Sequence, residues 1–566
     1  MRNPNHLYCL FEKASRLYPD ELCFLTESSQ LTYSEAEAQI SKVYDTILLN
    51  AKFEQIIGVP TTRSIEQIVF VLAILKAGMA YLPIDFGYPK KRLESMISNS
   101  NLSFCLTTKA DEDNVLDIGL KPLIFYGSKQ PINDLTKYPN PEKSATYILY
   151  TSGSTGEPKG VCMGEKAMMN LITWQNENSI CKNGSRTLQF APLSFDVSFQ
   201  EIMATLSNGG TLVLINETLR LDMVALLEYI QEQRINRLFL PFVALQAIAE
   251  AALSLQAYPS SLKEIMTAGE QLKITPQVIN LFKNLNNCVL YNQYGPTECH
   301  VVSELKLEGD PINWPTLPTI GKPISNVSII ILDQNKNIAP DGTIGELCIA
   351  GECLAEGYMN NKELTDEKFL NWVAPDGTKT RIYRTGDIAQ YLPDGNIEFL
   401  GRQDDQVKIS GHRIELAEIE LAINSLPGIQ QTAVTATHHL AGQTQLVAYI
   451  QQSDKTIDAN GIRQKVSDLL PDYMLPSYFI LVEEFPRTSS GKIDRKKLPA
   501  PQYSRPSSAP LYKPATTQTQ KNITKVWVDL LLIPEIGIND NFFELGGTSL
   551  LAQKVVANLL KDYNYR

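Results

Sequence analysis

The sequence predicts an α/β protein made of a large multilayer N-terminal part, a small α+β subdomain and a short helical piece. Three observations predict this. Helical and strand patterns alternate between about residues 60 and 300, β patterns dominate after Pro315, and a Pro- and Ser-dense segment at 498–517 precedes the last helices. At 566 residues the chain is too long for one core, and size priors suggest about three to four domains.

The first part reads as a series of βαβ units with a largely parallel sheet. Residues 64–76 form the clearest helix, because Ser64 and Gln67 fit a capping box, an apolar run follows and Gly78 ends it. Further helices are expected in LDMVALLEYIQEQ, ALQAIAEAAL and PQVINLFKNL, and strands in AYLPI, TLVLI, RLFL, LKEIMT and CVLYN.

The later parts change pattern. VSIIIL, GELCIAG and GNIEFLGR lie between Gly, Asp and Pro turns and predict a β-rich piece. After Arg402, helices in ELAEIELAINSL and GIRQKVSDLL and strands in QTAVTA and QLVAYI predict a small α+β unit. The segment 498–517 is an extended, semi-rigid linker, and a helix, a loop and a second helix follow it.

Composition excludes several classes of function. A net charge of -11 argues against nucleic acid or an anionic membrane as the main partner. The longest apolar run, 68–75, is too short to span a membrane, and the N-terminus lacks an apolar signal core, so we expect a cytoplasmic protein. The nine cysteines form no C-x-x-C pair, and the five histidines lack metal-ligand spacing.

The stretch YILYTSGSTGEPKG, residues 147–160, has the chemistry of a phosphate-binding loop. It does not fit the P-loop spacing, because Pro158 stands five residues after Gly153. Glycines let backbone N–H groups approach phosphate oxygens, and Lys159 adds a positive charge. A flexible surface turn is the alternative, but the loop directly follows a buried-looking strand, where active-site loops are placed.

Four more motifs follow in the chain: YNQYGPTE at 291–298, YRTGD at 383–387, GRQDDQVKISGHRIE at 401–415 and SSGKIDR at 489–495. In this order the five motifs resemble those of the adenylate-forming enzymes, specifically the amino-acid adenylation domains of nonribosomal peptide synthetases. The resemblance covers about residues 8–500. It implies an N-terminal core at 1–401 and a small, mobile C-terminal subdomain at 402–497.

The resemblance implies a set of ATP-binding residues: Thr151, Ser152, Gly153, Ser154, Thr155, Lys159, Asn292, Tyr294, Thr297, Asp387 and Arg402. The loop would hold the β- and γ-phosphates, Asn292 and Tyr294 the adenine, and Asp387 the two ribose hydroxyls. Glu298 would bind Mg²⁺, which prefers oxygen ligands. Taken singly, these polar side chains would read as surface charges or ordinary ion pairs.

Lys492 is the expected catalytic residue. When a substrate carboxylate attacks the α-phosphate, two anions meet, and an ammonium group on a long stem can bridge them. Asp404 matches the hinge of the family. Rotation about it would withdraw Lys492 after adenylate formation and bring the VKISGHR loop, residues 407–413, to the same site.

Asp196 of SFDVSFQE matches the carboxylate that pairs with the α-amine of an amino-acid substrate. The same resemblance assigns the rest of the substrate pocket to Val197, Gln200, Phe239, Met266, Ala268, Gly269, Gln293, Val301 and Val302. These side chains carry no charge, so we expect a neutral amino acid. The pattern is similar to that of proline-activating pockets, but Gln293 stands where those usually have histidine, and another aliphatic amino acid is the alternative.

The C-terminal piece, residues 518–566, resembles a peptidyl carrier domain. DNFFELGGTSLLAQ matches its phosphopantetheine attachment motif, with Ser549 at the start of an amphipathic helix. A plain helix-capping serine is the alternative reading. The family's carrier domains are four-helix bundles, so we expect this one to be incomplete at its C-terminus and to leave apolar faces uncovered.

Together these features predict an amino-acid-activating ligase. It would convert ATP and a neutral amino acid to aminoacyl-AMP and pyrophosphate, then load the phosphopantetheine thiol on Ser549. The implied partners are a phosphopantetheinyl transferase, downstream synthetase modules and, in some relatives, an MbtH-like helper. Because Met1 stands almost at the adenylation domain, a loading or stand-alone module is expected. An acyl-CoA ligase that uses free CoA, or an inactive scaffold, is the alternative.

Overall fold

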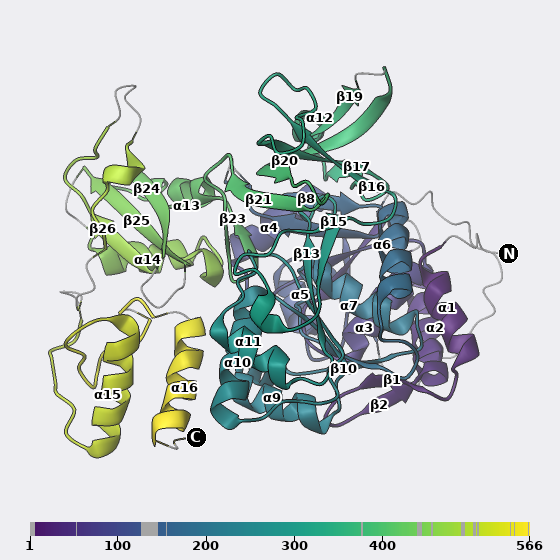
Figure 1. Cartoon of the computed structure of the whole chain (residues 1–566), viewed down its shortest axis with the longest axis horizontal. Coiled ribbons are helices and arrows are strands. Elements are labelled where there is room, and N and C mark those ends of the chain that lie inside the picture. Colours follow the sequence, from purple (N-terminus) through teal and green to yellow (C-terminus); the bar gives the residue numbers. More distant parts are fainter. Residues whose placement is uncertain are drawn as a thin grey trace.

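The computed structural model describes residues 6–51, 54–125, 145–153, 156–374, 377–438, 444–453, 457–487, 493–501, 505, 509–543, 545–547, 549–563 and 565. Figure 1 shows a large body at the right with a β-rich piece above it, and two smaller bodies at the left. The upper left body is the small subdomain, and the lower left body holds the last two helices. This agrees with the α/β class and the succession of parts that the sequence predicts.

The large body contains two mostly parallel sheets. The nine strands of the first are, in spatial order, β15 (Lys322–Pro323), β14 (Ser303–Leu307), β13 (Val289–Tyr294), β12 (Glu264–Thr267), β11 (Arg237–Leu240), β9 (Arg186–Gln189), β10 (Thr211–Leu214), β1 (Leu22–Leu25) and β2 (Gln30–Thr32). The seven strands of the second are β18 (Gly357–Tyr358), β8 (Lys159–Met163), β7 (Tyr147–Thr151), β4 (Ala80–Ile84), β3 (Ile56–Pro60), β5 (Phe104–Thr107) and β6 (Lys121–Ile124).

Helices cover these sheets in layers. They are α1 (Tyr8–Leu17), α2 (Tyr33–Asn50), α3 (Ile65–Lys76), α4 (Lys90–Ser100), α5 (Glu112–Asp117), α6 (Glu165–Asn178), α7 (Asp196–Leu206), α8 (Glu217–Leu221), α9 (Met223–Glu232), α10 (Phe242–Leu255) and α11 (Pro276–Asn284). The run Ile65–Leu75 of α3 is buried throughout, because α3 belongs to the central core. The Ser64 hydroxyl accepts the Gln67 N–H as predicted, while the Gln67 amide donates to the Pro60 carbonyl.

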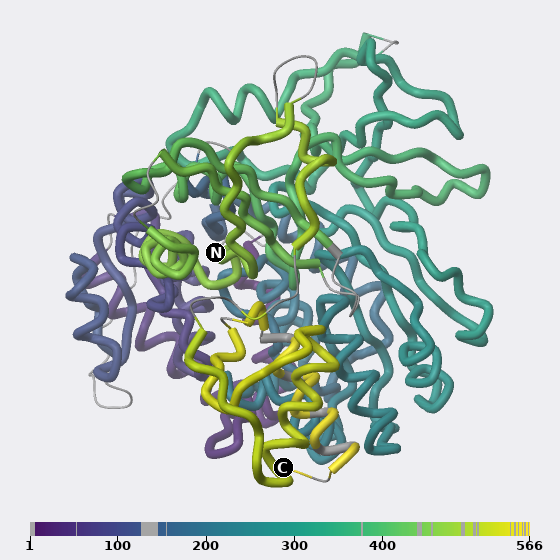
Figure 2. Tube along the Cα trace, turned by 90° about the vertical axis from the view of Figure 1, so that its left-hand side faces the viewer, coloured from purple at the N-terminus to yellow at the C-terminus, as the bar shows by residue number. Residues whose placement is uncertain are grey.

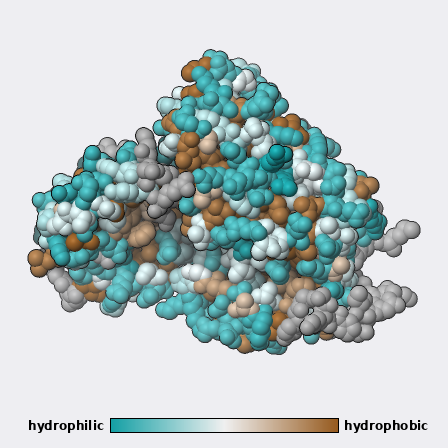
Figure 3. All heavy atoms as spheres, turned by 90° about the horizontal axis from the view of Figure 1, so that it is seen from below, coloured by the Kyte–Doolittle hydropathy of each residue, from teal (hydrophilic) through white to brown (hydrophobic). Residues whose placement is uncertain are grey.

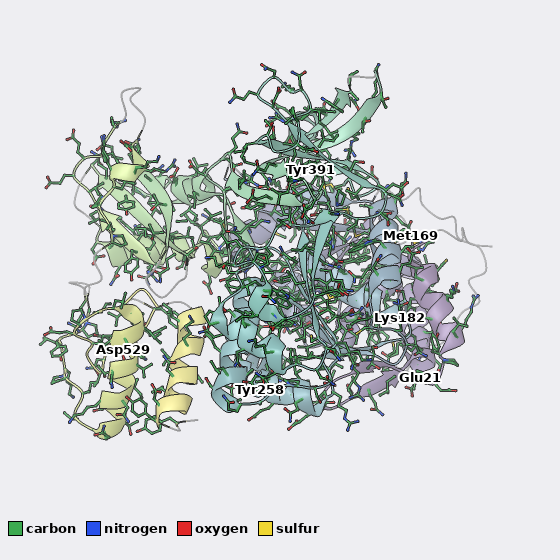
Figure 4. The ribbon with its side chains drawn as sticks, viewed as in Figure 1. Glu21, Met169, Lys182, Tyr258, Tyr391 and Asp529 are labelled. Carbon is green, nitrogen blue, oxygen red and sulfur yellow. The ribbon has the colours of Figure 1, made fainter. Side chains whose placement is uncertain are left out.

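The β-rich piece consists of antiparallel strands and one short helix: β16 (Val327–Leu332), β17 (Gly345–Gly351), α12 (Lys362–Lys368), β19 (Phe369–Val373), β20 (Lys379–Tyr391) and β21 (Ile397–Arg402). Strand β20 is the centre of this sheet, since it pairs with β17, β19 and β21. Tyr391, labelled in Figure 4, ends β20 and donates its hydroxyl to the Ile329 carbonyl. The pairing holds Asp387 opposite Arg402.

The small subdomain has its own core. Its elements are β22 (Val407–Ile409), β23 (His412–Ile414), α13 (Leu416–Asn424), β24 (Ile429–His438), β25 (Thr444–Gln452), α14 (Ala459–Ser467) and β26 (Tyr478–Leu481). Ile419 and Ile423 of α13 pack with Ile462 and Val466 of α14 against the three-stranded sheet. The hairpin β22–β23 reaches from this subdomain to the large body (Figure 1).

The last two helices are α15 (Gln518–Leu531) and α16 (Ser549–Tyr563). The expectation that this piece leaves its apolar faces uncovered is wrong for a small cluster, which buries Val526, Leu531, Ile533, Ile536, Phe542, Leu545, Leu551 and Val555. Helix α16 also contacts α10 of the large body. Figure 2 shows these helices, in yellow, in front of the teal helices of the core, and Figure 4 places α16 between Asp529 on α15 and Tyr258 after α10.

Among the described helices, none is long and apolar enough to cross a membrane. Figure 3 shows mostly hydrophilic residues on the face seen from below, with apolar residues in small separate areas. A groove on this face separates the smaller bodies from the large one.

A buried ion pair ties the first sheet to the helices beside it. Arg237 and Glu264 are register partners on β11 and β12, and their side chains are 3.5 Å apart and 2% and 0% exposed. Arg237 also donates to the hydroxyls of Thr187 and Thr205. Such a pair is costly to break from one side, because the remaining charge stays buried without compensation.

We therefore expect Glu264→Ala to lower the free energy of unfolding of the large body by about 3–5 kcal/mol. Thermal unfolding followed by circular dichroism measures the effect as a lower midpoint. The matched control replaces both charges, Arg237→Met with Glu264→Leu, and should be less destabilised than Glu264→Ala. A double variant that unfolds earlier than the single one would contradict this account of the pair.

Candidate active site

A cavity lies where the large body, the β-rich piece and the small subdomain meet. The large body contributes the ends of β7, β12 and the segment after β13, together with the first turns of α7. The small subdomain contributes the β22–β23 hairpin and Tyr473. The polar and charged residues that line it are Tyr88, Tyr150, Thr151, Ser152, Ser194, Asp196, Gln200, Thr297, His300, Asp387, Arg402, Lys408, His412, Arg413 and Tyr473.

The phosphate-loop candidates stand at the end of β7 and meet the small subdomain. The Ser152 hydroxyl donates to the Arg413 carbonyl at 2.7 Å and accepts the Glu415 N–H at 3.2 Å. The Gly153 N–H donates to Glu418 Oε2 at 3.1 Å. Ser154 and Thr155 lie outside the described residues. The Ser152 hydroxyl and the Gly153 N–H at the start of the loop are therefore both bonded to groups of the small subdomain.

Glu418 comes from the first turn of α13 and is buried against the large body. Its second oxygen accepts Arg92 Nη1 at 2.7 Å, and the two side chains are 2% and 5% exposed. Burial raises the pKa of Glu418, which Arg92 only partly opposes. The Glu418 carboxylate thus accepts the hydrogen bond from the Gly153 N–H, where a phosphate oxygen of ATP would be expected.

Glu298 is the centre of a second set of charges. It is fully buried, and its carboxylate accepts Arg413 Nη1 at 2.8 Å and the Tyr358 hydroxyl at 2.7 Å, with Lys159 Nζ at 3.7 Å. Burial alone would raise the pKa of Glu298, but Arg413 and Lys159 outweigh it and lower the pKa to about 2. This carboxylate is ionised, and an ionised oxygen ligand suits a metal ion that takes the place of Arg413.

Lys159 is the second cation of this set. It extends from β8, pairs in register with Thr151 and lies 5.4 Å from the centre of the Tyr358 ring. Burial, and then the nearby Arg413, lower the pKa of Lys159 to about 8, although Glu298 opposes the shift. Its ammonium therefore lies between the loop and the buried carboxylate.

Of the residues expected at the nucleoside, Thr297, Asp387 and Arg402 line the cavity, and Tyr294 bonds to Asp387. The Tyr294 hydroxyl donates to one oxygen of Asp387, and Arg402 Nη1 donates to the other at 2.5 Å. Asn292 donates to the Thr319 carbonyl at 2.8 Å, and Thr297 lines the cavity. Asp387 thus presents a buried carboxylate beside an aromatic ring, a combination that fits a ribose and a base.

Asp404 follows β21 and joins the β-rich piece to the hairpin. Arg402 donates to both of its oxygens, at 2.7 and 2.8 Å. Lys408, three residues after Asp405, lies with Nζ 5.8 Å from the centre of the Tyr294 ring, and His412 stacks on Tyr473 with ring centroids 3.8 Å apart. The VKISGHR loop therefore lines the cavity in this structure, while the rotation about Asp404 stays a prediction of the sequence.

Asp196 begins α7, and its carboxylate accepts the Val197 N–H at 2.7 Å. Six of the expected substrate residues line the cavity, namely Asp196, Val197, Gln200, Ala268, Gly269 and Val301. The other four lie behind this lining. Phe239 and Met266 form a small apolar cluster with Tyr291, Val302 belongs to the central core, and Gln293 bonds to Gln200.

Lys492 lies outside the described residues. Ser549 is the first residue of α16, and its side chain is outside the described part of the chain. The segment just before it touches the small subdomain, because Gln445 donates to the Gly546 carbonyl at 3.4 Å. On the other side of α16, Lys554 lies 3.7 Å from Glu250 of α10. The start of α16 therefore stands between the small subdomain and the large body.

Several residues of the site carry no signal in the sequence. Arg92 and Glu418 are 326 positions apart and come from two helices that look like ordinary charged surfaces. His300 Nε2 lies 3.0 Å from the Asp196 carbonyl oxygen. Its position right after the YNQYGPTE motif is the one hint to it, since residues flanking a functional loop often share its site.

Models of known families match three successive parts of the chain. The AMP-binding enzyme model matches residues 11–359, the AMP-binding enzyme C-terminal domain 418–492, and the phosphopantetheine attachment site 521–566. The chain belongs to the AMP-binding enzymes. It is an adenylate-forming ligase of the nonribosomal peptide synthetase type, an adenylation domain followed by a carrier domain. This confirms the resemblance read from the five motifs and the FELGGTSL segment.

Curated relatives include gramicidin S synthase 2 of Brevibacillus brevis, 38% identical over 562 residues, and tyrocidine synthase 1 of Brevibacillus parabrevis, 35% identical over 560. The chain, matched over 99% and 98% of its length, spans 12% and 50% of these proteins. Among solved structures, holo-PA1221, an NRPS protein with adenylation and PCP domains bound to a vinylsulfonamide inhibitor, is similar with a TM-score of 0.80 and 26% identity. That match covers 99% of this chain and 92% of PA1221.

In this AMP-binding enzyme the small subdomain supplies a negative charge where a phosphate would bind and a positive charge where a metal ion would bind. The Glu418 carboxylate takes the loop amide of Gly153, and the Arg413 guanidinium takes the Glu298 carboxylate. A triphosphate and a metal ion would need the same two partners. The orientation in the structure and the binding of a polyphosphate are therefore mutually exclusive at these atoms.

We expect Glu418→Gln to slow thioester formation roughly tenfold or more, because Arg92 would lose its buried counter-charge in this orientation only. Amino-acid-dependent ATP–pyrophosphate exchange should stay within about twofold of the parent, because Glu418 would have to leave the loop before ATP binds. Single-turnover loading of the carrier domain and pyrophosphate exchange measure the two half-reactions separately.

The matched control is Glu420→Gln on the same helix, whose side chain bonds to Arg495 and the Val434 N–H within the small subdomain. Glu420→Gln should leave the ratio of the exchange rate to the loading rate unchanged. Equal losses of exchange and loading in Glu418→Gln would contradict the competition between Glu418 and the polyphosphate.

Proposed function

We propose that this ligase activates a neutral amino acid, proline or another aliphatic one, and loads it onto its own carrier domain. The first half-reaction would join the amino-acid carboxylate to the α-phosphate of ATP and release pyrophosphate. The second would transfer the aminoacyl group to the thiol of phosphopantetheine on Ser549 and release AMP. A role as a loading or stand-alone module of a peptide synthetase stays a prediction of the sequence.

The observation that carries this proposal is the position of Asp196. Its carboxylate lines the same cavity as Asp387 and Ser152, the ribose and phosphate candidates. A carboxylate at the cavity wall is suited to an ammonium group, because an ion pair offsets the cost of burying either charge. An acid without an α-amine would leave Asp196 without this partner.

Specific residues would serve the first half-reaction. Tyr294 and Asn292 would orient the base, Asp387 would accept the ribose hydroxyls, and Gly153, Ser152 and Lys159 would bind the phosphates. Glu298 would hold Mg²⁺ once Arg413 has withdrawn, and the ion would neutralise phosphate charge. Lys492 would bridge the attacking carboxylate and the α-phosphate.

The second half-reaction would use the orientation described above. The hairpin β22–β23 contributes Lys408, His412 and Arg413 to the lining of the cavity, which supports a role for it after pyrophosphate has left. The contacts of Gly546 with Gln445 and of Lys554 with Glu250 hold the start of α16 near this subdomain and α10. A phosphopantetheinyl transferase would first have to modify Ser549. Downstream modules of a synthetase and an MbtH-like protein are further partners that the sequence predicts.

The decisive test is ATP–pyrophosphate exchange with a panel of proline, branched aliphatic, aromatic and charged amino acids, together with hydroxy and aryl acids that lack an α-amine. We expect strong exchange with one or a few neutral amino acids and none with the acids, because only the former pair with Asp196. Exchange supported by acids without an α-amine would overturn the role of Asp196 and favour an acyl-CoA ligase. Absence of exchange with every compound of the panel would count against the proposal as a whole.

Lys492→Ala should reduce exchange by about a thousandfold, since it removes the cation that stabilises the transition state of adenylation. Loading from added aminoacyl-AMP should persist, because Lys492 would have left the site in the second orientation. Ser549→Ala is the complementary control, with normal exchange and no loading. Full exchange in Lys492→Ala would rule out a catalytic role for this lysine.

A further inference from the structure

Behind the substrate end of the cavity lies a group of four polar side chains, three of them buried and one, Glu304, half-buried. Gln175 of α6, Gln200 of α7 and Gln293 of β13 are 2%, 0% and 3% exposed. Glu304 of β14 stands directly opposite Gln293 in the antiparallel pairing of the two strands. Four hydrogen bonds link these side chains, and three apolar residues, Phe239, Met266 and Tyr291, form a cluster on the same sheet.

The hydrogen bonds have one direction when the Glu304 carboxyl is ionised. Gln293 Nε2 donates to Glu304 Oε2 at 2.8 Å and to Gln175 Oε1 at 3.2 Å. Because an ionised carboxylate only accepts hydrogen bonds, Glu304 requires the amide nitrogen of Gln293 on its side. The Gln293 oxygen must then face Gln200.

The orientation of the Gln293 amide in turn determines the orientation of the Gln200 amide. Its Nε2 donates to Gln293 Oε1 at 3.2 Å and to Gln175 Oε1 at 2.7 Å, which uses both of its hydrogens. Its Oε1 is buried and has no hydrogen-bond partner among the described residues. Of the four side chains, Gln200 is the one that lines the cavity. The orientation of Gln200 is therefore set by Glu304, through Gln293, and by Gln175.

A buried acceptor without a partner is costly unless a ligand supplies a donor. An ammonium group is a poor match, because one neutral oxygen does not offset the desolvation of a full charge. A hydroxyl is a good match, since it donates a single hydrogen bond and brings no net charge. The chemistry of the wall thus selects the side chain of the amino acid as well as its α-amine.

We propose that Gln200 Oε1, held by Gln175, Gln293 and Glu304, selects an amino acid whose aliphatic side chain carries a hydroxyl group. Gln200 contacts the substrate, while Gln175 and Glu304 are positioning residues that fix its amide. This inference rests on the proposed function and narrows its substrate class from neutral amino acids to hydroxylated aliphatic ones.

The test compares kcat/KM for pyrophosphate exchange within pairs that differ mainly by the hydroxyl: threonine and valine, serine and alanine, 4-hydroxyproline and proline. The assay is run above the pKa of Glu304, which burial raises to about 7, so that its carboxyl is an ionised acceptor. In the preferred pair, the hydroxylated member should be favoured by about tenfold or more.

Glu304→Gln keeps the shape of the side chain but removes the carboxylate that can only accept a hydrogen bond. The amide groups of Gln293 and Gln200 can then rotate by 180° and exchange their oxygen and nitrogen atoms. The preference within the pair should fall to about twofold or less, and Gln200→Met should abolish it. The matched control is Glu308→Gln, just after the same strand and 62% exposed, which should keep the parental preference. General damage to the enzyme lowers kcat/KM for both members of a pair alike. The ratio of the two kcat/KM values therefore reports the orientation of the Gln200 amide.

Two results would overturn the inference and leave the proposed function standing: exchange that is equal or better with the member lacking the hydroxyl, or a preference that survives both Glu304→Gln and Gln200→Met. Failure of every neutral amino acid, with exchange from acids lacking an α-amine, would overturn the proposed function and this inference with it. The two failures are therefore distinguishable in one assay.

Discussion

The cavity of this AMP-binding enzyme depends on the Glu298 carboxylate, which is buried and needs a cation in every state. In the structure that cation is Arg413, assisted by Lys159. The Gly153 N–H likewise needs a hydrogen-bond acceptor, and in the structure the Glu418 carboxylate is that acceptor. Both partners come from the small subdomain, so its orientation is coupled to the charges that the cavity holds. Moving the subdomain away costs free energy unless another cation takes the place of Arg413 and another acceptor takes the place of Glu418.

The register of β13 and β14 has a comparable role for the side-chain end of the cavity. Side chains alternate across a strand, so Asn292 and Gln293 point to opposite faces of β13. On one face Asn292 bonds to Thr319, and the other face holds Gln293 against Glu304. A shift of one residue would exchange these roles. The pairing of Gln293 with Glu304 thereby links the register of the sheet to the orientation of Gln200, which lines the cavity.

Much of the fold was predictable, because local signals and tertiary packing agree there. The buried run of α3, the strands β10 to β13 and the small α+β unit follow hydrophobic patterns that their final environments require. The carrier segment was harder to predict. Its apolar side chains find partners within two helices and a loop, and α16 packs on α10, a surface that no pattern near residue 549 reveals.

The sequence by itself determined the family, because five polar motifs and the segment before Ser549 combine residue types that only nucleotide and phosphopantetheine chemistry require together. It also pointed to Asp196, Asp387 and Arg402, which line one cavity, and to Glu298, which pairs with Arg413 of the same lining. Only the tertiary structure decided that Glu418 pairs with Arg92, that Arg413 reaches Glu298 and that Glu304 directs Gln200 through Gln293. Such contacts join residues far apart in the chain, and their energies come from burial and geometry, which a linear pattern does not carry.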